Sequence, residues 1–391
     1  MRRLTSIVLA AACCVTGPYL TAADSPPASL YQVTILQSSG AQGNSVNDVG
    51  VVAGSYTLPN GVLHASLWAF GRQLDLGTLG KGAGLSSRVQ WPVKNVLGMI
   101  SGISLTDQLD PNQEGWSCGF FLNNPGFNVC LGFVWDWLDG MRALPTLGGT
   151  NGFATGTNNL GQTAGWAETT VRDPSCIAPQ VLQFLPVVWG PGRAQITALP
   201  LAPGDSAGAA TALNDRGQVV GISGSCGFAV GGPTGKHAVL WENGTPTVLV
   251  NPNGAPYWNT PMMISERGDV VGFAGAPNDA AGNFTPPFMW TREQGWVFLP
   301  LLAGEIAGVA TSINAGRQVV GYSNDANGNF HAWIYQNGVV RNLNDLIEPG
   351  SGLTGPIQLA FDINDQGAIT GSSTTGQAFL ATPVGAWPER R

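Results

Sequence analysis

The chain has 391 residues, of which 10% are charged and 43% hydrophobic, while Gly (55) and Pro (27) together exceed a fifth of it. This composition is typical of many short strands joined by tight turns and argues against a disordered chain. The formal net charge is −7, and lysine occurs only at Lys81, Lys94 and Lys236. No basic stripe is available for a phosphate backbone, so we expect no nucleic-acid partner.

Residues 1–23 are predicted to be a signal peptide. Arg2 and Arg3 precede an apolar run, and small residues ending at Ala23 offer a cleavage site. The run is too short to span a bilayer, and no other stretch of roughly 18 apolar residues follows it. We therefore expect a secreted, extracellular or periplasmic protein in which residues 24–391 form one domain. Cys13 offers an alternative, a lipid anchor, although Leu9 lies one place too early for the usual lipobox.

The rest of the chain is a repeat. The phrase ALNDRGQVVG at 212–221 recurs in seven units, which begin their turns at Asn47, Asn95, Asn158, Asn214, Ser265, Asn314 and Asn364. Successive units are 48 to 63 residues apart, close to the ~50-residue period of kelch-type propeller blades. Asn and Asp favour turn starts and Gly supplies a positive φ, so the phrase predicts a hairpin between two strands.

Each unit is predicted to be a four-stranded antiparallel meander. In the fourth unit the strands are expected at 209–214, 218–223, 237–241 and 245–250. Small and β-branched residues suit a sheet that is packed on both faces, as a propeller blade is. A recurring aromatic residue on the third strand is expected to fill the space between blades, at Trp68, Trp135, Trp189, Trp241, Trp290 and Tyr335.

The last unit ends on its third strand near 378–382, without a clear outer strand. Residues 30–36 (LYQVTIL) precede the first turn and occupy the place of an outer strand. We predict that this segment completes blade 7, which gives an all-β, seven-bladed propeller closed by its N-terminal strand. Closure would remove open sheet edges. An open solenoid with two bare ends is the alternative.

The NDxGxVVG, HAxLW and LGTLG steps resemble the HAF-repeat family of bacterial extracellular proteins over nearly the whole chain after residue 23. Departures occur at Val96, at Ser265 with Glu266, and at Gly316. The resemblance implies export and a repeat architecture, and it transfers no catalytic residue.

Four long insertions fall between second and third strands, at 105–131, 168–185, 224–236 and 274–285. They are expected on one face of the propeller, where a binding site would lie. The four cysteines that follow the signal peptide all lie in these insertions and permit three pairings. Cys118 with Cys130 would enclose one loop, and Cys176 with Cys226 would staple blade 3 to blade 4.

Candidate catalytic side chains are few. His64, His237 and His331 share one repeat position at the start of a third strand, which favours a structural hydrogen bond over catalysis. Carboxylates for glycoside hydrolysis could come from the insertions, although solvated loop carboxylates are far commoner than catalytic ones; these are Asp107, Asp110, Glu114, Glu168 and Asp173.

Two further features are candidate binding sites. Trp116, Trp166 and Trp258 lie outside the recurring aromatic position and are candidate ligand-stacking residues, although burial under the insertions is favoured over this interpretation. Asp325, Asn327 and Asn329 begin like a calcium loop but lack its closing Glu, which favours a polar turn. No metal or cofactor is predicted.

The sequence therefore predicts a monomeric, non-enzymatic binding or scaffold propeller with its variable loops on one face. Its partner would be a carbohydrate or another extracellular protein. A carbohydrate-active lyase or hydrolase that uses the loop carboxylates is the alternative.

Overall fold

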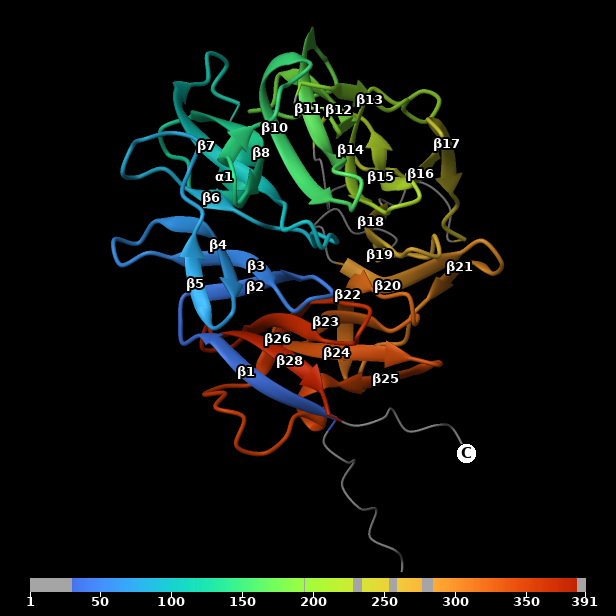
Figure 1. Ribbon diagram of the computed structural model, residues 1–391. Helices are drawn as coiled ribbons and strands as arrows, with labels where there is room; N and C mark the ends of the chain where they lie inside the picture. Colours follow the sequence, from blue (N-terminus) through green and yellow to red (C-terminus); the bar gives the residue numbers. More distant parts are fainter. Residues whose placement is uncertain are drawn as a thin grey trace, which may run out of the picture.

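A computed structural model describes residues 30–114, 116–192, 194–227, 234–252, 259–275 and 284–384. The strands of these residues form seven four-stranded antiparallel sheets, arranged as blades around a central axis (Figure 1). The predicted seven-bladed propeller is confirmed. Within the described residues, no helix has the length and apolar character needed to cross a bilayer.

The blades follow the chain, each running from an inner to an outer strand. Their strands are β2 (Ala41–Val46), β3 (Val52–Thr57), β4 (Leu63–Ala69) and β5 (Arg72–Asp75) in blade 1; β6 (Ser87–Arg88), β7 (Ile100–Leu109), β8 (Asn128–Asp136) and β9 (Gly140–Ala143) in blade 2; β10 (Gly148–Thr157), β11 (Thr163–Arg172), β12 (Leu182–Trp189) and β13 (Ile196–Ala198) in blade 3; β14 (Ala207–Leu213), β15 (Val219–Gly224), β16 (His237–Glu242) and β17 (Thr245–Leu249) in blade 4; β18 (Asn259–Ile264), β19 (Val270–Gly275), β20 (Phe284–Thr291) and β21 (Gly295–Phe298) in blade 5; β22 (Glu305–Ile313), β23 (Val319–Asp325), β24 (Phe330–Gln336) and β25 (Val339–Asn342) in blade 6; and β26 (Ile357–Ile363), β27 (Ile369–Ser373) and β28 (Ala378–Pro383) in blade 7.

Blade 7 is completed from the other end of the chain. Strand β1 (Tyr31–Gln37) pairs antiparallel with β28, from Tyr31 opposite Pro383 to Gln37 opposite Ala378 (Figure 1, blue against red). The predicted closure by the N-terminal strand is confirmed. Because β1 and β28 come from opposite ends of the chain, the ring is held shut by a ladder of backbone hydrogen bonds.

The recurring turns hold the blades together near the axis. In blade 3 the side-chain oxygen Oδ1 of Asn158 accepts hydrogen bonds from the backbone amides of Leu160 and Gln162, which fixes the hairpin. The Asn158 Nδ2 donates to the Asn214 carbonyl of the next blade, 3.0 Å away. Equivalent bonds run from Asn214 to Ser265, from Asn314 to Asn364 and, across the ring closure, from Asn364 to Asn47.

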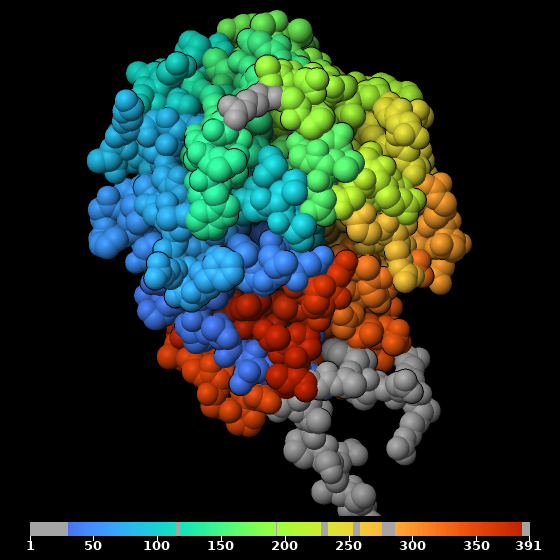
Figure 2. Space-filling model, in the orientation of Figure 1, coloured from blue at the N-terminus to red at the C-terminus, as the bar shows by residue number. Residues whose placement is uncertain are grey.

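The residue after each turn Asn adds a second set of contacts between blades. The Asp215 carboxylate accepts from the Asn159 amide at 2.7 Å, and Asp48 accepts from the Asp365 amide across the closure at 2.9 Å. Val96 and Ala315 have no polar side chain to continue the series. Figure 2 shows the face that carries these turns, where the blue, cyan and red turns of blades 1, 2 and 7 meet near the centre.

The core lies between the blades. The recurring aromatic residues on the third strands are buried or half-buried there, and the indole N–H of Trp189 and of Trp241 donates to the carbonyls of Pro145 and Pro200 in the preceding blade connections. Six inner strands also carry a register shift just before the turn, at Asn44, Thr155, Thr211, Met262, Thr311 and Phe361. Such bulges bend a strand locally.

The blade 2 insertion is more structured than a loop. Strands β7 and β8 extend into it, and helix α1 (Trp116–Phe121) lies between them. Phe121 packs edge-on against Trp91 and Phe153, with ring centroids 5.4 and 4.8 Å apart. These residues belong to one buried cluster with inner-strand residues of blades 3 and 4, so the insertion is anchored in the core.

Candidate functional site

Both disulfides form as the placement of the insertions suggested. Cys118 bonds to Cys130 within the blade 2 insertion, and Cys176 bonds to Cys226 between the insertions of blades 3 and 4. All four sulfur-bearing side chains pack against the same buried cluster. The insertions of blades 2, 3 and 4 are therefore tied into one platform, which we call the insertion platform.

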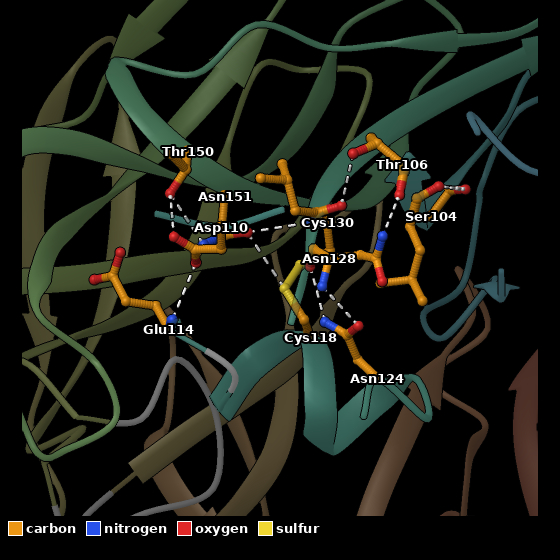
Figure 3. Close-up of a disulfide and its surroundings, with 12 residues drawn as sticks. Ser104, Thr106, Asp110, Glu114, Cys118, Asn124, Asn128, Cys130, Thr150 and Asn151 are labelled. Carbon is orange, nitrogen blue, oxygen red and sulfur yellow. Dashed lines mark hydrogen bonds between the residues drawn. A yellow bond between two sulfur atoms is a disulfide. The ribbon is translucent and has the colours of Figure 1, made fainter. Parts of the chain in front are cut away.

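A cluster of buried carboxylates lies at the heart of the insertion platform. Asp110, Glu114 and Glu168 are 4%, 2% and 3% exposed. The Asp110 oxygens accept from the Asn112 and Glu114 amides at 2.9 and 3.1 Å, which folds the loop on itself. Asp110 also accepts from Asn151 Nδ2 of blade 3 at 2.8 Å (Figure 3). Backbone and side-chain donors thus surround a carboxylate that the sequence analysis treated as solvated.

Glu114 connects the insertions of blades 2 and 3. Its Oε1 accepts from the amides of Val181 and Leu182, where β12 begins, and its Oε2 accepts from Asn112 Nδ2 at 3.0 Å. Gln180 Nε2 lies between Glu114 Oε1 and Glu168 Oε1, at 3.4 and 2.9 Å. One amide group therefore separates two buried carboxylates.

Glu168 has the most perturbed acidity of the cluster. Burial, reinforced by the nearby Glu114 charge, raises the pKa of Glu168 to about 7. Its Oε2 accepts from the Asn151 amide at 2.7 Å and from the Thr150 hydroxyl at 3.0 Å. These hydrogen bonds only partly offset the cost of an ionised group in this environment.

The geometry gives these carboxylates a structural role. Each of their six oxygens accepts at least one hydrogen bond from the protein, and none of the three side chains is exposed by more than 4%. The other two candidates bond elsewhere: Asp107 accepts from the Lys81 and Gly82 amides, and Asp173 accepts from Ser175.

Asn151 and Gln180 are the organisers that the sequence analysis missed. Asn151 donates through Nδ2 to Asp110 and accepts, through Oδ1, from the Cys130 amide beside the disulfide at 3.0 Å (Figure 3). Asn151 is buried on the inner strand β10, and Gln180 is buried in the insertion of blade 3. These two residues carry no sequence signal beyond an amide side chain. The acids that they contact lie up to 66 positions away in the sequence, so no local pattern reveals the contacts.

Of the three candidate tryptophans, the structure describes the surroundings of Trp166. Trp166 is 3% exposed and stacks on Phe153 with ring centroids 4.4 Å apart, so burial, the alternative, applies to it. Its ring cannot stack on a ligand at the surface because it forms part of the core between blades. Trp116 is the first residue of α1, and Trp258 lies outside the described residues, as do the signal peptide and Cys13.

The histidines make the structural hydrogen bonds predicted for them. In each case Nδ1 contacts a carboxylate: His64 with Asp75 at 2.8 Å, His237 with Asp205 at 2.7 Å, and His331 with Glu305 at 2.7 Å. The acid lies just before the inner strand in blade 4, is the first residue of the inner strand in blade 6, and is the last residue of the outer strand in blade 1. The shared position therefore fastens the start of the third strand to another part of the same blade.

Two other polar features are explained by local structure. Asn327 and Asn329 donate to Asp325, and hydrogen bonds led by the Asn329 side chain lower the pKa of Asp325 to about 2. This is the polar turn that was favoured over a calcium loop. Asp173 lies close to Cys176 and Cys226, but those two sulfurs are joined in a disulfide and cannot act as thiolate ligands.

A cavity of ≈160 Å³ lies on the axis at the turn face, and residues of all seven blades line it. At this cavity Lys94 Nζ lies 2.6 Å from Asp362 Oδ1, which is fully buried. Burial raises the pKa of Asp362, opposed by the Lys94 charge. Lys94 also donates to the Ile363 carbonyl, so one side chain of blade 2 holds blade 7.

The fold and site define a seven-bladed β-propeller with one disulfide-tied insertion platform. No family model matches the chain, and no curated protein matches it. Among solved structures, it is similar to virginiamycin B lyase from Staphylococcus aureus (11% identity, 90% of this chain and 98% of that chain, TM-score 0.48). It is also similar to YCF48 bound to D1 peptide (11%, 93% and 100%, TM-score 0.47) and to the polysaccharide lyase PL25-Ulvanlyase (10%, 91% and 94%, TM-score 0.46). Likenesses this distant assign neither an activity nor a ligand.

Proposed function

We propose that this protein is an exported, non-enzymatic binding or scaffold propeller whose ligand contacts the insertion platform of blades 2 to 4. The single observation that carries the proposal is the saturated carboxylate cluster, because its groups support the platform and are not free to act on a substrate. Membership of the HAF-repeat family, a monomeric state and export by residues 1–23 belong to the same proposal. Two disulfides suit an oxidising compartment.

The surface of the platform supports a binding role. Large apolar side chains are exposed to solvent on the insertions of blades 2 and 3: Leu109, Phe120, Phe127, Val171 and Ile177. Phe120 is 75% exposed although its neighbour Phe121 is buried in the core. Exposed apolar groups on a rigid base are typical of contact surfaces for sugars or proteins.

The alternative is a carbohydrate-active lyase or hydrolase that uses the loop carboxylates. Such an enzyme needs an acid and a base that reach the scissile bond. An enzyme that used Asp110, Glu114 or Glu168 would have to break hydrogen bonds that hold the insertions together. No observation favours this rearrangement.

A glycan array tests the proposal with the mature chain as it is. The test variant combines Phe120→Ser with Phe127→Asn, which suits the positive φ of Phe127 (52°). The control is Leu160→Ser, which removes an exposed apolar side chain on the turn face. We expect selective binding that the platform variant loses and the control keeps. Equal binding by both variants would contradict the platform as the contact face, and no binding by the wild type would exclude a sugar ligand and leave the protein partner.

A further inference from the structure

The mouth of the axial cavity is ringed by carboxylates. Four of the residues that line the cavity are acidic, and they come from blades 1, 4, 5 and 7: Asp48, Asp215, Glu266 and Asp365. Each accepts a hydrogen bond from a backbone amide, and among the described residues none of the four forms an ion pair. Asp48, Glu266 and Asp365 are exposed residues. The ring is therefore open to solvent at the turn face.

The positive charges beside the ring do not balance it. Lys94, on the wall of the cavity, is already held in its ion pair of 2.6 Å. Arg216 donates from Nη1 to the Glu266 carbonyl, and its charge acts on the Glu266 carboxylate. Burial nevertheless raises the pKa of Glu266, and the charges of Asp215 and Asp365 add to this effect. A ring of like charges that repels itself is stabilised by a bound cation.

The cavity behind the ring is partly apolar. Its walls include Met263, Ile264 and Ile313, where the inner strands β18 and β22 end. Its volume is ≈160 Å³, and a cavity of about 150 Å³ accepts benzene. A lysine side chain is no bulkier than benzene, and it joins an apolar stem to an ammonium group. The cavity offers contacts to both parts.

Exposed apolar side chains lie beside the cavity on blades 1 to 3. Four apolar residues of these turns are more than half exposed: Val49, Val96, Leu97 and Leu160. The Val96 amide donates to Asn159 Oδ1 at 2.8 Å, so the turns of blades 2 and 3 are in contact. In blades 4 and 5 the place of Leu160 is taken by Arg216 and Arg267. An apolar patch beside a charged ring is typical of a surface that binds a protein segment.

We propose that the turn face binds a partner segment in which a lysine lies between apolar residues. The lysine side chain enters the axial cavity, where its ammonium group meets the uncompensated carboxylates, and the flanking apolar side chains pack on Val49, Leu97 and Leu160. Charge complementarity selects a cationic side chain and disfavours an acidic one. A second strand runs from the turn at one end of a blade to the insertion at the other. This surface is therefore distinct from the insertion platform.

Isothermal titration with the peptide acetyl-Leu-Lys-Leu-amide tests the surface. Two further peptides separate its components, because acetyl-Leu-Gln-Leu-amide lacks the charge and acetyl-Gly-Lys-Gly-amide lacks the apolar side chains. We expect the wild type to bind the first peptide about tenfold more tightly than either of the others, since charge and apolar contacts both contribute. The double variant Val49→Ser, Leu97→Ser should lower the affinity for acetyl-Leu-Lys-Leu-amide to nearly that for acetyl-Gly-Lys-Gly-amide.

The double variant Glu266→Gln, Asp365→Asn tests the ring, because it removes two charges and keeps side-chain oxygens that accept the backbone hydrogen bonds. It should bind acetyl-Leu-Lys-Leu-amide about tenfold or more weakly than the wild type. Because it relieves repulsion, it should unfold thermally at or above the wild-type temperature, which separates loss of the site from loss of the fold. The matched control Asp345→Asn, Glu348→Gln removes two charges from the connection between blades 6 and 7 and should bind as the wild type does.

The variant that carries Phe120→Ser and Phe127→Asn should retain the peptide, so failure of the platform proposal is recorded separately. Absence of acetyl-Leu-Lys-Leu-amide binding by the wild type would overturn the inference. Equal binding of the uncharged peptide, or equal binding by Glu266→Gln, Asp365→Asn, would overturn it as well.

Discussion

Single charged side chains in this protein are buried where they join one strand to another part of the fold. Glu168 accepts donors from the start of blade 3, and Asp362 in blade 7 receives Lys94 from blade 2. In both cases burial raises the pKa of the acid. Such groups make the stability of the fold depend on pH, and the direction follows from which state binds more protons.

Glu168→Gln should flatten the pH dependence of stability. The pKa of Glu168 is about 7 in the folded chain and 4.5 in its ordinary state, so the folded chain binds more protons between these values. The free energy of unfolding of the wild type should therefore fall as pH rises through this window, by roughly 3 kcal/mol from this group. Urea unfolding at a series of pH values measures it. The control Glu348→Gln, in the connection between blades 6 and 7, should keep the wild-type dependence of the free energy of unfolding on pH. If Glu168→Gln also kept this dependence, the account of the Glu168 proton would be contradicted.

Lys94→Met should destabilise the ring by about 3 to 5 kcal/mol, because it leaves the buried Asp362 carboxylate without its partner. The deficit should shrink at lower pH, where Asp362 takes up a proton. The double variant Lys94→Met, Asp362→Asn should recover much of the loss in urea unfolding at neutral pH. A double variant no more stable than Lys94→Met would contradict the pairing.

At the scale of elements, the insertions differ from the repeats that carry them. The strands of the repeats follow a local alternation and a turn phrase, so their order and approximate limits could be predicted from sequence. The extension of β7 and β8 and the presence of α1 could not, because the blade 2 insertion is shaped by contacts with blade 3, such as Glu114 with Val181. The burial of Trp166 was among the interpretations that the sequence allowed, but its partners Phe153 and Phe121 were not, because local patterns do not join them.

Removal of the first disulfide should loosen one insertion and leave the ring folded. The double variant Cys118→Ala, Cys130→Ala removes a cross-link between residues that lie 12 positions apart. Hydrogen bonds of Asp110 and Asn124 still hold the segments beside it. Limited proteolysis should then cut within 109–127 before any other described segment, while the far-ultraviolet circular dichroism of the sheets is retained. The matched variant Cys176→Ala, Cys226→Ala should leave 109–127 at its wild-type cleavage rate. Cooperative unfolding of the whole chain on loss of Cys118–Cys130 would contradict this division.

The whole molecule combines a regular ring with an irregular face. The ring could be predicted almost entirely, including the closing strand, because seven units at a steady spacing leave one outer strand missing and one extra strand at the start. The chemistry of the face could not, since Asn151 and Gln180 contact Asp110 and Glu114 of blade 2, which no local pattern joins to them. The repeats specify the scaffold, and the contacts across blades specify the site.

Hydrogen–deuterium exchange of the mature chain at neutral pH tests the closed ring and its platform in one measurement. Because β1 is paired to β28 along its length, the amides of residues 31–37 that donate to β28 should be protected from exchange. The amides of Val181 and Leu182, which donate to Glu114, should also be protected. Exchange of 31–37 at the rate of a free chain, with the inner strands still protected, would contradict closure of the seventh blade by the N-terminal strand.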